Sequence, residues 1–189
     1  LKGAKTVEKA LNTPSVQDIL ESLKEALKKH DAIDVITLTA NGEPTLYPDL
    51  KALVEGIHAI KEGHKVLILS NGSTIANPNI QMILSTIDIV KLSLDCVSPE
   101  SFKKLDRAHK GIDVLDIIEG MKVFRKLYKG ELVIEVLVVE GLNDTQEAFI
   151  ALNHVLQEIQ PNHVDIGTID RPPAYAIKGV SVERLVDLS

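Results

Sequence analysis

Polar residues that could bind a small ligand follow the first strongly apolar run of the chain. That run, Asp34–Thr39, is rich in β-branched residues, and the segment Asn41-Gly42-Glu43-Pro44-Thr45 comes directly after it. Gly42 lets the backbone take a positive φ and approach a ligand closely. Pro44 stiffens the turn and lacks an N–H, which leaves carbonyls free to accept from an ammonium group, and Glu43 adds a carboxylate beside them. The segment therefore predicts a site for an amino group, with a capped turn before the next helix as the alternative.

Two further apolar runs also end in polar side chains. Ser70-Asn71-Gly72-Ser73 closes the second run with a hydroxyl, an amide and a glycine, a combination that ordinary turns also use. In the third run, Ser93 and Asp95 alternate with leucines, so both face one side near its carboxyl end. A carboxylate at Asp95 suits a ribose hydroxyl pair or an ammonium group, and a turn-forming aspartate fits the pattern equally well. Ligands of α/β folds lie at the carboxyl ends of the strands, which is why these positions are candidates.

Other residues with chemical potential carry weaker signals. Glu135 lies inside the fourth apolar run, and because a buried carboxylate without a partner is costly, we expect an edge position with solvent access. Cys96 is the only cysteine and cannot by itself hold an iron–sulfur cluster or a structural zinc, so we expect a small buried thiol. None of the six histidines has metal-ligand spacing. The locally basic segment from Lys103 to Lys110 fits either a solvated helix face or a grip on nucleic-acid phosphates. Phosphate-loop, dinucleotide-binding and serine-hydrolase signatures are absent from the sequence, which argues against those activities.

Hydrophobic periodicity divides the chain into helices that alternate with short apolar runs. Such an alternation predicts parallel βα units, and the expected fold is α/β: an open parallel sheet or part of a (β/α) barrel. Five runs are expected to be strands: Asp34–Thr39, Lys65–Leu69, Asp88–Leu94, Leu132–Val139 and His163–Ile169. We expect helices over Ser15–His30, Leu50–Lys61 and Val114–Tyr128, and a short helix near Val182–Leu188. Three more are expected to begin at N-terminal caps: at Asn77-Pro78, at Ser98-Pro99 and at a capping box of Asp144 and Glu147.

Length, charge and topology bound the molecule as a whole. The 189 residues contain no linker or composition shift, so we expect a single domain over residues 1–189. The net charge of -6 gives no overall basic field for nucleic acid. No apolar run approaches the ~20 residues of a membrane span, and the single cysteine fits a reducing compartment, so we expect a cytoplasmic protein without a membrane partner. The first helix precedes the first strand, whereas each helix of a βα repeat follows one. Together with a first residue that is Leu1 and not Met, this predicts that an upstream strand is missing.

Five short motifs, in order, resemble those of the radical S-adenosylmethionine enzymes. Gly42–Pro48 resembles their GGEP(T)-L-P segment, with Asn41 in place of the first glycine. Ser70-Asn71-Gly72 is similar to their TNG, Leu92–Asp95 to their SLD and Val138–Asp144 to their V-x-G-x-N/T-D. The stretch from Ile169 to Ala174 resembles the RPPA segment of the iron–sulfur oxidoreductase branch related to tRNA wyosine synthases. Each match is weak alone, but five in order are strong.

The resemblance implies a partial (β/α)6 radical-SAM barrel that uses S-adenosylmethionine and a [4Fe–4S] cluster. In the family, a C-x-x-x-C-x-x-C loop holds the cluster by three thiolates, and one electron cleaves S-adenosylmethionine to methionine and a 5′-deoxyadenosyl radical, which abstracts hydrogen from the substrate. A modified tRNA base is one candidate substrate, contacted by Lys104, Arg107 and Arg171, and a flavodoxin or ferredoxin is the implied electron donor. The implied cofactor-binding residues are Asn41, Gly42, Glu43 and Pro44 for the methionine amino group, Ser70, Asn71, Ser93 and Asp95 for the ribose and methionyl portions, and Val139 and Ile169 beside the adenine.

One part of the family pattern is missing. The sequence contains no C-x-x-x-C-x-x-C motif, and Cys96 lies in the wrong place to replace it. Because that motif belongs to the upstream strand that the topology lacks, we expect an N-terminally truncated, inactive fragment of a radical S-adenosylmethionine oxidoreductase that holds neither cofactor by itself. Two alternatives stay open: a glycyl-radical enzyme activase, whose partner is a protein, and a cluster-free module that binds S-adenosylmethionine or a partner. Without its neighbour, the strand at Asp34–Thr39 exposes an edge, which predicts edge-to-edge pairing of two copies.

Overall fold

A curved parallel sheet forms the centre of the protein. The computed structural model describes residues 13–106, 108–170 and 176–188, and within them the sheet has five parallel strands in the order β1-β2-β3-β4-β5. The predicted α/β fold, a partial (β/α) barrel of parallel strands, is therefore confirmed. Arg107 and Arg171, two of the expected substrate contacts, lie outside the described residues. The strands are β1 (Val35–Leu38), β2 (Lys65–Ser70), β3 (Ile89–Ser93), β4 (Glu131–Val138) and β5 (His163–Thr168).

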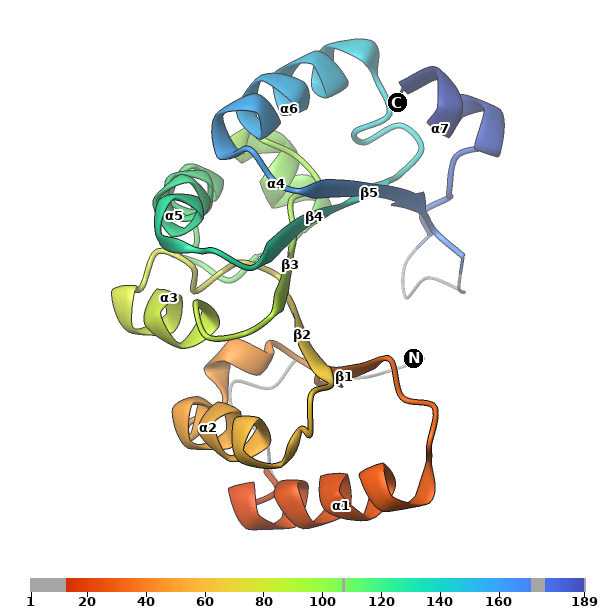
Figure 1. Ribbon diagram of the computed structural model, residues 1–189. Coiled ribbons are helices and arrows are strands. Elements are labelled where there is room, and N and C mark those ends of the chain that lie inside the picture. The colour runs from red at the N-terminus through yellow and green to blue at the C-terminus, as the bar shows by residue number, and fades with distance from the viewer. Residues whose placement is uncertain (1–12, 107, 171–175, 189) are drawn as a thin grey trace.

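Helices follow the strands along one side of this sheet (Figure 1). Alternate residues of the strands face these helices and are fully buried, among them Val66, Val90 and Ile134. A continuous apolar core of such residues joins the sheet to the helices. The elements are α1 (Val16–Lys29), the 3-10 turn η1 (Pro44–Leu46), α2 (Leu50–Ile60), α3 (Pro78–Leu84), α4 (Pro99–Leu105), α5 (Val114–Leu127), α6 (Gln146–Ile159) and α7 (Val182–Leu188).

The inner face is the side of the sheet opposite to the helix-covered core. Lys91 and Ser93 of β3, Glu135 and Leu137 of β4, and Asp165 of β5 are on this face, because they alternate with the buried residues. Glu135 is half-exposed here and lies 3.8 Å from Lys91 Nζ. The expected solvent access of Glu135 is thus confirmed, but the expected edge position is wrong, since β4 lies between β3 and β5.

Local capping explains most of the helix starts. Asn77 and Ser98 cap α3 and α4 as predicted, each accepting a backbone N–H with its side chain and each followed by proline. The expected capping box at Asp144 is wrong, because Thr145 caps α6 by accepting from Ala148 N while Asp144 accepts from Gly141 N. Gly141 has a positive φ, and because the Asp144 side chain accepts its N–H, that side chain stabilises the turn before α6 and not the helix start. None of the helices in the described ranges is long and apolar enough to cross a membrane.

Candidate functional site

Glu43 joins the first two strand ends. Its Oε1 accepts hydrogen bonds from Thr45 N (2.9 Å) and Thr45 Oγ1 (2.6 Å), and its Oε2 accepts from Asn71 N (2.7 Å). A second contact between the two loops pairs the hydroxyls of Thr45 and Thr74 at 2.6 Å. Charge-assisted hydrogen bonds of this kind are stronger than neutral ones. The Glu43 carboxylate therefore holds the turn after β1 against the turn after β2, and its own hydrogen-bonding capacity is largely used in doing so.

The turn that precedes η1 differs from the expected geometry in two ways. Gly42 does not have a positive φ, so the expected left-handed conformation at this position is wrong. The carbonyls of Glu43 and Pro44 are not free, because they accept from Leu46 N and Tyr47 N within η1. Within the part of the chain that the structure describes, the carbonyl oxygens of Asn41 and Gly42 accept no hydrogen bond. A Cβ added to Gly42 would meet nothing within 4 Å, so its backbone is open to a ligand.

The turn after β2 is built from short-range hydrogen bonds. Ser70 Oγ accepts from Gly72 N (3.1 Å), and Asn71 Oδ1 accepts from Ser73 N (2.9 Å). Ser70 is buried, whereas Asn71 is exposed. Gly72 has φ +74°, and a Cβ there would lie 3.1 Å from Met121 Cε, so this position requires glycine both for its conformation and for its packing. The positive φ that was expected at Gly42 is found here instead.

Ser93 lies on the inner face of β3, and Asp95 continues its alternation with buried leucines two residues beyond the end of this strand. Leu94 N donates to Glu135 O (2.9 Å), which continues the pairing of β3 with β4 by one residue. Beyond it, the Asp95 side chain replaces a backbone partner, because its Oδ1 accepts from Leu137 N (2.8 Å). Burial raises the pKa of Asp95 to about 7; the hydrogen bond from Leu137 N opposes this, and the charges of Asp106 and Glu135 add to it. Asp95 can therefore exist as a neutral carboxylic acid near neutral pH and donate a hydrogen bond.

Val139 and Ile169 follow the last two strands. Val139 is fully buried, its N–H donates to Asn143 Oδ1 (2.7 Å), and its carbonyl accepts from Leu142 N (3.1 Å). Both backbone groups of Val139 thus have partners within the protein. Ile169 is partly buried and comes directly after Thr168, whose hydroxyl donates to Val138 O and accepts from Val180 N. This threonine links the ends of β4 and β5 to the segment that precedes α7.

Two further candidate residues, Lys104 and Cys96, differ from the residues at the strand ends in exposure or in chemistry. Lys104 is exposed on α4, where its Nζ pairs with Glu100 Oε1 at 2.7 Å. Cys96 is buried and donates its thiol hydrogen to Asp106 Oδ2 (3.6 Å), and burial raises the pKa of this thiol. The prediction of a buried thiol is confirmed. A neutral, hydrogen-bonded thiol is a poor metal ligand, because metals bind the thiolate.

A protein-family comparison identifies the superfamily. The model described as the Radical SAM superfamily matches residues 4–152. The chain belongs to the radical SAM superfamily. Members of this superfamily use S-adenosylmethionine and a [4Fe–4S] cluster, and a solved neighbour, the methyltransferase TsrM from Kitasatospora setae, has the cluster bound.

Curated and solved radical SAM relatives extend this comparison. A UPF0026 protein from Helicobacter pylori strain J99 is 38% identical over 190 residues, which cover 100% of this chain and 61% of that protein. A GTP 3′,8-cyclase from Streptomyces coelicolor is 30% identical over 105 residues, 56% of this chain and 30% of its own length. A structure of TYW1 with a lysine–pyruvate adduct shares the fold at a TM-score of 0.64 and 18% identity, over 91% of this chain and 56% of that one. The chain thus spans less than two thirds of each relative.

The two cofactors of the radical SAM superfamily fit this chain differently. The open backbone at Gly42, the carbonyls of Asn41 and Gly42, which accept no hydrogen bond from the described residues, and the carboxyl group of Asp95 match the amino and hydroxyl groups of S-adenosylmethionine. A [4Fe–4S] cluster needs three cysteine thiolates in this family, and the sequence has a single cysteine. In the described ranges, no group of three His, Cys, Asp or Glu residues could hold a metal ion either. The residues of this chain therefore fit the first cofactor and not the second.

Two features of this radical SAM site were not assigned from the sequence. Asn143 was noted only as part of a motif, yet its amide contacts Leu137 of β4 and the residues that follow β3 and β4, Asp95 and Val139. The Thr45–Thr74 hydroxyl pair was also missed, because two residues 29 positions apart carry no local signal. For Asn143 a signal existed: it comes five residues after the end of β4, and asparagine side chains often bond to nearby backbone groups in turns.

Proposed function

We propose that the whole protein to which this chain corresponds cleaves S-adenosylmethionine reductively and uses the resulting 5′-deoxyadenosyl radical to abstract hydrogen from a substrate. The observation that carries this proposal is the turn after β1, which is held by Glu43 and leaves the Asn41 and Gly42 backbone open. Superfamily membership supports the same reaction type. The single cysteine and the absence of a long apolar run support a location in the reducing cytoplasm.

The residues of this chain would bind and orient the cofactor. In this proposal, the carbonyls of Asn41 and Gly42 accept hydrogen bonds from the methionine ammonium. The Asp95 carboxyl group and the Ser93 hydroxyl face the ribose from the end of β3, and the loops after β4 and β5 border the adenine. S-adenosylmethionine supplies the radical chemistry when bound, while the protein supplies position and exclusion of water. This chain, with its single cysteine, does not supply the ligands of an iron–sulfur cluster.

The substrate would lie on the inner face, next to the proposed cofactor position. A modified tRNA base is a proposed substrate, with Lys104 as one contact to phosphate, and a flavodoxin or ferredoxin is the proposed electron donor. The net charge of -6 supports only a local contact with nucleic acid. Binding of tRNA that weakens steeply with salt would support this substrate, and salt-independent or absent binding would argue for a protein or small-molecule substrate.

The proposed function is tested on the complete reading frame that contains this chain. Protein purified without oxygen is analysed for iron and sulfide and is assayed, with dithionite as reductant, for 5′-deoxyadenosine. We expect about four iron atoms per chain and formation of 5′-deoxyadenosine. A protein without iron that still binds S-adenosylmethionine would overturn the proposal in favour of a cluster-free binding module, which the single cysteine of this chain also supports.

The turn after β1 is tested by Gly42→Val. Because nothing lies within 4 Å of the added Cβ and φ is not positive, valine should be accommodated without loss of the fold. Its branched side chain would occupy the space through which a ligand reaches the backbone. We expect the affinity for S-adenosylmethionine, measured by calorimetry, to fall about tenfold or more, which is about 1.4 kcal/mol. Ala59→Val on the exposed side of α2 is the control, and equal affinity of wild type and Gly42→Val would contradict the role of this turn.

A further inference from the structure

One buried amide connects the ends of β3 and β4. The Asn143 side chain is 2% exposed. Its Nδ2 donates to Asp95 O (2.7 Å) and to Leu137 O (2.9 Å), and its Oδ1 accepts from Val139 N (2.7 Å). All three partners are backbone atoms that the regular strand pairing leaves without a backbone partner at the point where β3 and β4 separate.

Only an amide of this size can satisfy these three groups together. Asparagine offers two donors and one acceptor, whereas aspartate has no donor and alanine has neither. Buried backbone groups that lose their partners cost about 1–3 kcal/mol each. The Asn143 side chain therefore fixes the spacing between the carbonyl of Asp95 and the N–H of Val139.

The same amide is linked to the Asp95 carboxyl group through Leu137. Leu137 donates its N–H to Asp95 Oδ1 and accepts from Asn143 Nδ2 at its carbonyl. The Leu137 residue is thus held at both ends, by the Asp95 side chain and by the Asn143 side chain. A cavity of ≈ 70 Å³, lined by Asp95, Asn143 and residues of α6, adjoins the amide.

We propose that Asn143 is a positioning residue of the cofactor site: without touching the cofactor, it sets the Asp95 carboxyl group and the backbone at Val139 at the spacing that S-adenosylmethionine requires. This inference rests on the proposed function for the identity of the ligand. The coupling of Asn143 to Asp95 does not depend on the identity of the ligand.

The test uses a matched buried amide as its control. Gln81 is 5% exposed, and its Nε2 donates to the carbonyls of Ile75 (2.8 Å) and Gly120 (3.2 Å), away from the strand ends. Asn143→Ala removes three buried side-chain hydrogen bonds and Gln81→Ala removes two, so both should lower stability. Asn143→Ser, which keeps an oxygen to accept from Val139 N, serves if the alanine variant does not fold.

Two measurements on each folded variant separate positioning from stability. Calorimetry with S-adenosylmethionine should show about a tenfold loss of affinity for the Asn143 variants and no change for Gln81→Ala. The titration of the Asp95 carboxyl carbon by NMR should move toward the ordinary aspartate range in the Asn143 variants, because water reaches the group, and should stay in place in Gln81→Ala.

Each result decides a separate point. An unchanged Asp95 titration in the Asn143 variants would overturn the positioning role. An altered titration with unchanged affinity for S-adenosylmethionine would overturn the statement that the spacing serves this cofactor. If the wild-type chain shows no S-adenosylmethionine binding, the proposed function loses its support in this chain, while the titration still decides whether Asn143 positions Asp95.

Discussion

At the scale of single residues, the two carboxylates of the site have different surroundings and different roles. Glu43 accepts from three donors of the protein and connects two loops. Asp95 accepts from Leu137 N through one oxygen and lies near Asp106 and Glu135, which disfavour its charge. The Glu43 side chain is therefore held in place by its three donors, whereas the Asp95 carboxyl group, whose pKa burial raises to about 7, can change between donor and acceptor.

The raised pKa of Asp95 makes the stability of the protein depend on pH. Burial raises the pKa of Asp95 to about 7 in the folded state, against about 4 for an ordinary aspartate, so between these pH values the folded protein retains a proton that the unfolded chain has released. Stability from this group is therefore fully present below about pH 4 and is lost as the pH rises toward 7. Asp95→Asn should leave stability at pH 4 nearly unchanged and raise it at pH 8, measured by urea unfolding. The exposed Asp34→Asn is the control, and equal differences at both pH values would contradict the assignment.

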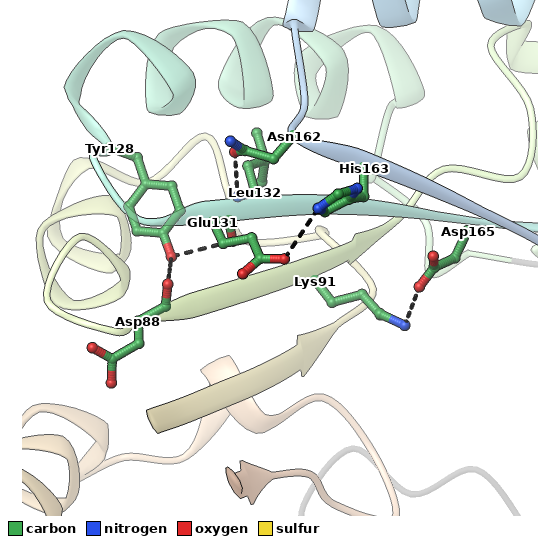
Figure 2. Close-up of polar contacts among 8 residues, drawn as sticks. All are labelled: Asp88, Lys91, Tyr128, Glu131, Leu132, Asn162, His163 and Asp165. Carbon is green, nitrogen blue, oxygen red and sulfur yellow. Dashed lines mark hydrogen bonds and ion pairs between the residues drawn. The ribbon is translucent and has the colours of Figure 1, made fainter. Parts of the chain in front are cut away.

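At the scale of elements, the amino ends of the central strands are joined by a single phenol. Tyr128 follows α5, is buried, and stacks on Phe124 with ring centroids 4.7 Å apart. Its hydroxyl lies near the carbonyls of Ile87 (2.9 Å), Asp88 (3.0 Å) and Glu131 (3.4 Å), the last two of which are drawn in Figure 2. The end of α5 is thereby fixed to the beginnings of β3 and β4, the two strands that carry Asp95 and Leu137 at their other ends.

Tyr128→Phe isolates this hydroxyl. The ring stack with Phe124 is retained, while buried carbonyls lose their donor, so we expect a loss of about 1–3 kcal/mol in the free energy of unfolding. Urea denaturation at constant pH measures it. Tyr47→Phe is the comparison, because the Tyr47 hydroxyl donates to Pro14 O at an exposed site and should contribute much less. Losses of equal size in the two variants would contradict the role assigned to Tyr128.

The order of the elements could be predicted from sequence because it depends on periodicity and turn residues. All five strands and the capped starts of α3 and α4 follow from such local patterns. The misplaced α6 cap shows the limit, since Asp144 and Thr145 are both good caps and the preceding turn decides between them. The edge position expected of Glu135 and the positive φ expected of Gly42 failed for a related reason, because strand order and tertiary contacts between loops set them.

At the scale of the whole molecule, the inner face changes character across the sheet. Leucines of β2 face it on one side, and charged side chains of β3, β4 and β5 face it on the other. Lys91 reaches from β3 across β4 to Asp165 Oδ2 at 2.6 Å, and Figure 2 shows this contact beside the His163–Glu131 pair. Since Lys91 is balanced by both Asp165 and Glu135, a substrate that lies over β3 to β5 meets a surface with no excess of positive charge. This favours local recognition of a base or a side chain over binding of a phosphate backbone.

We expect two copies of the chain to pair through the outer edge of β1. Within the ranges that the structure describes, β1 pairs with β2 and has no strand on its other side, and unpaired backbone groups at such an edge attract another strand. We expect a concentration-dependent dimer of this chain in sedimentation velocity. Thr37→Lys places a charge at an exposed position of this strand and should shift the equilibrium to monomer, whereas Ala59→Lys on α2 should not. A monomer at all concentrations, or a dimer that Thr37→Lys leaves unchanged, would show that the edge is covered or that another surface forms the contact.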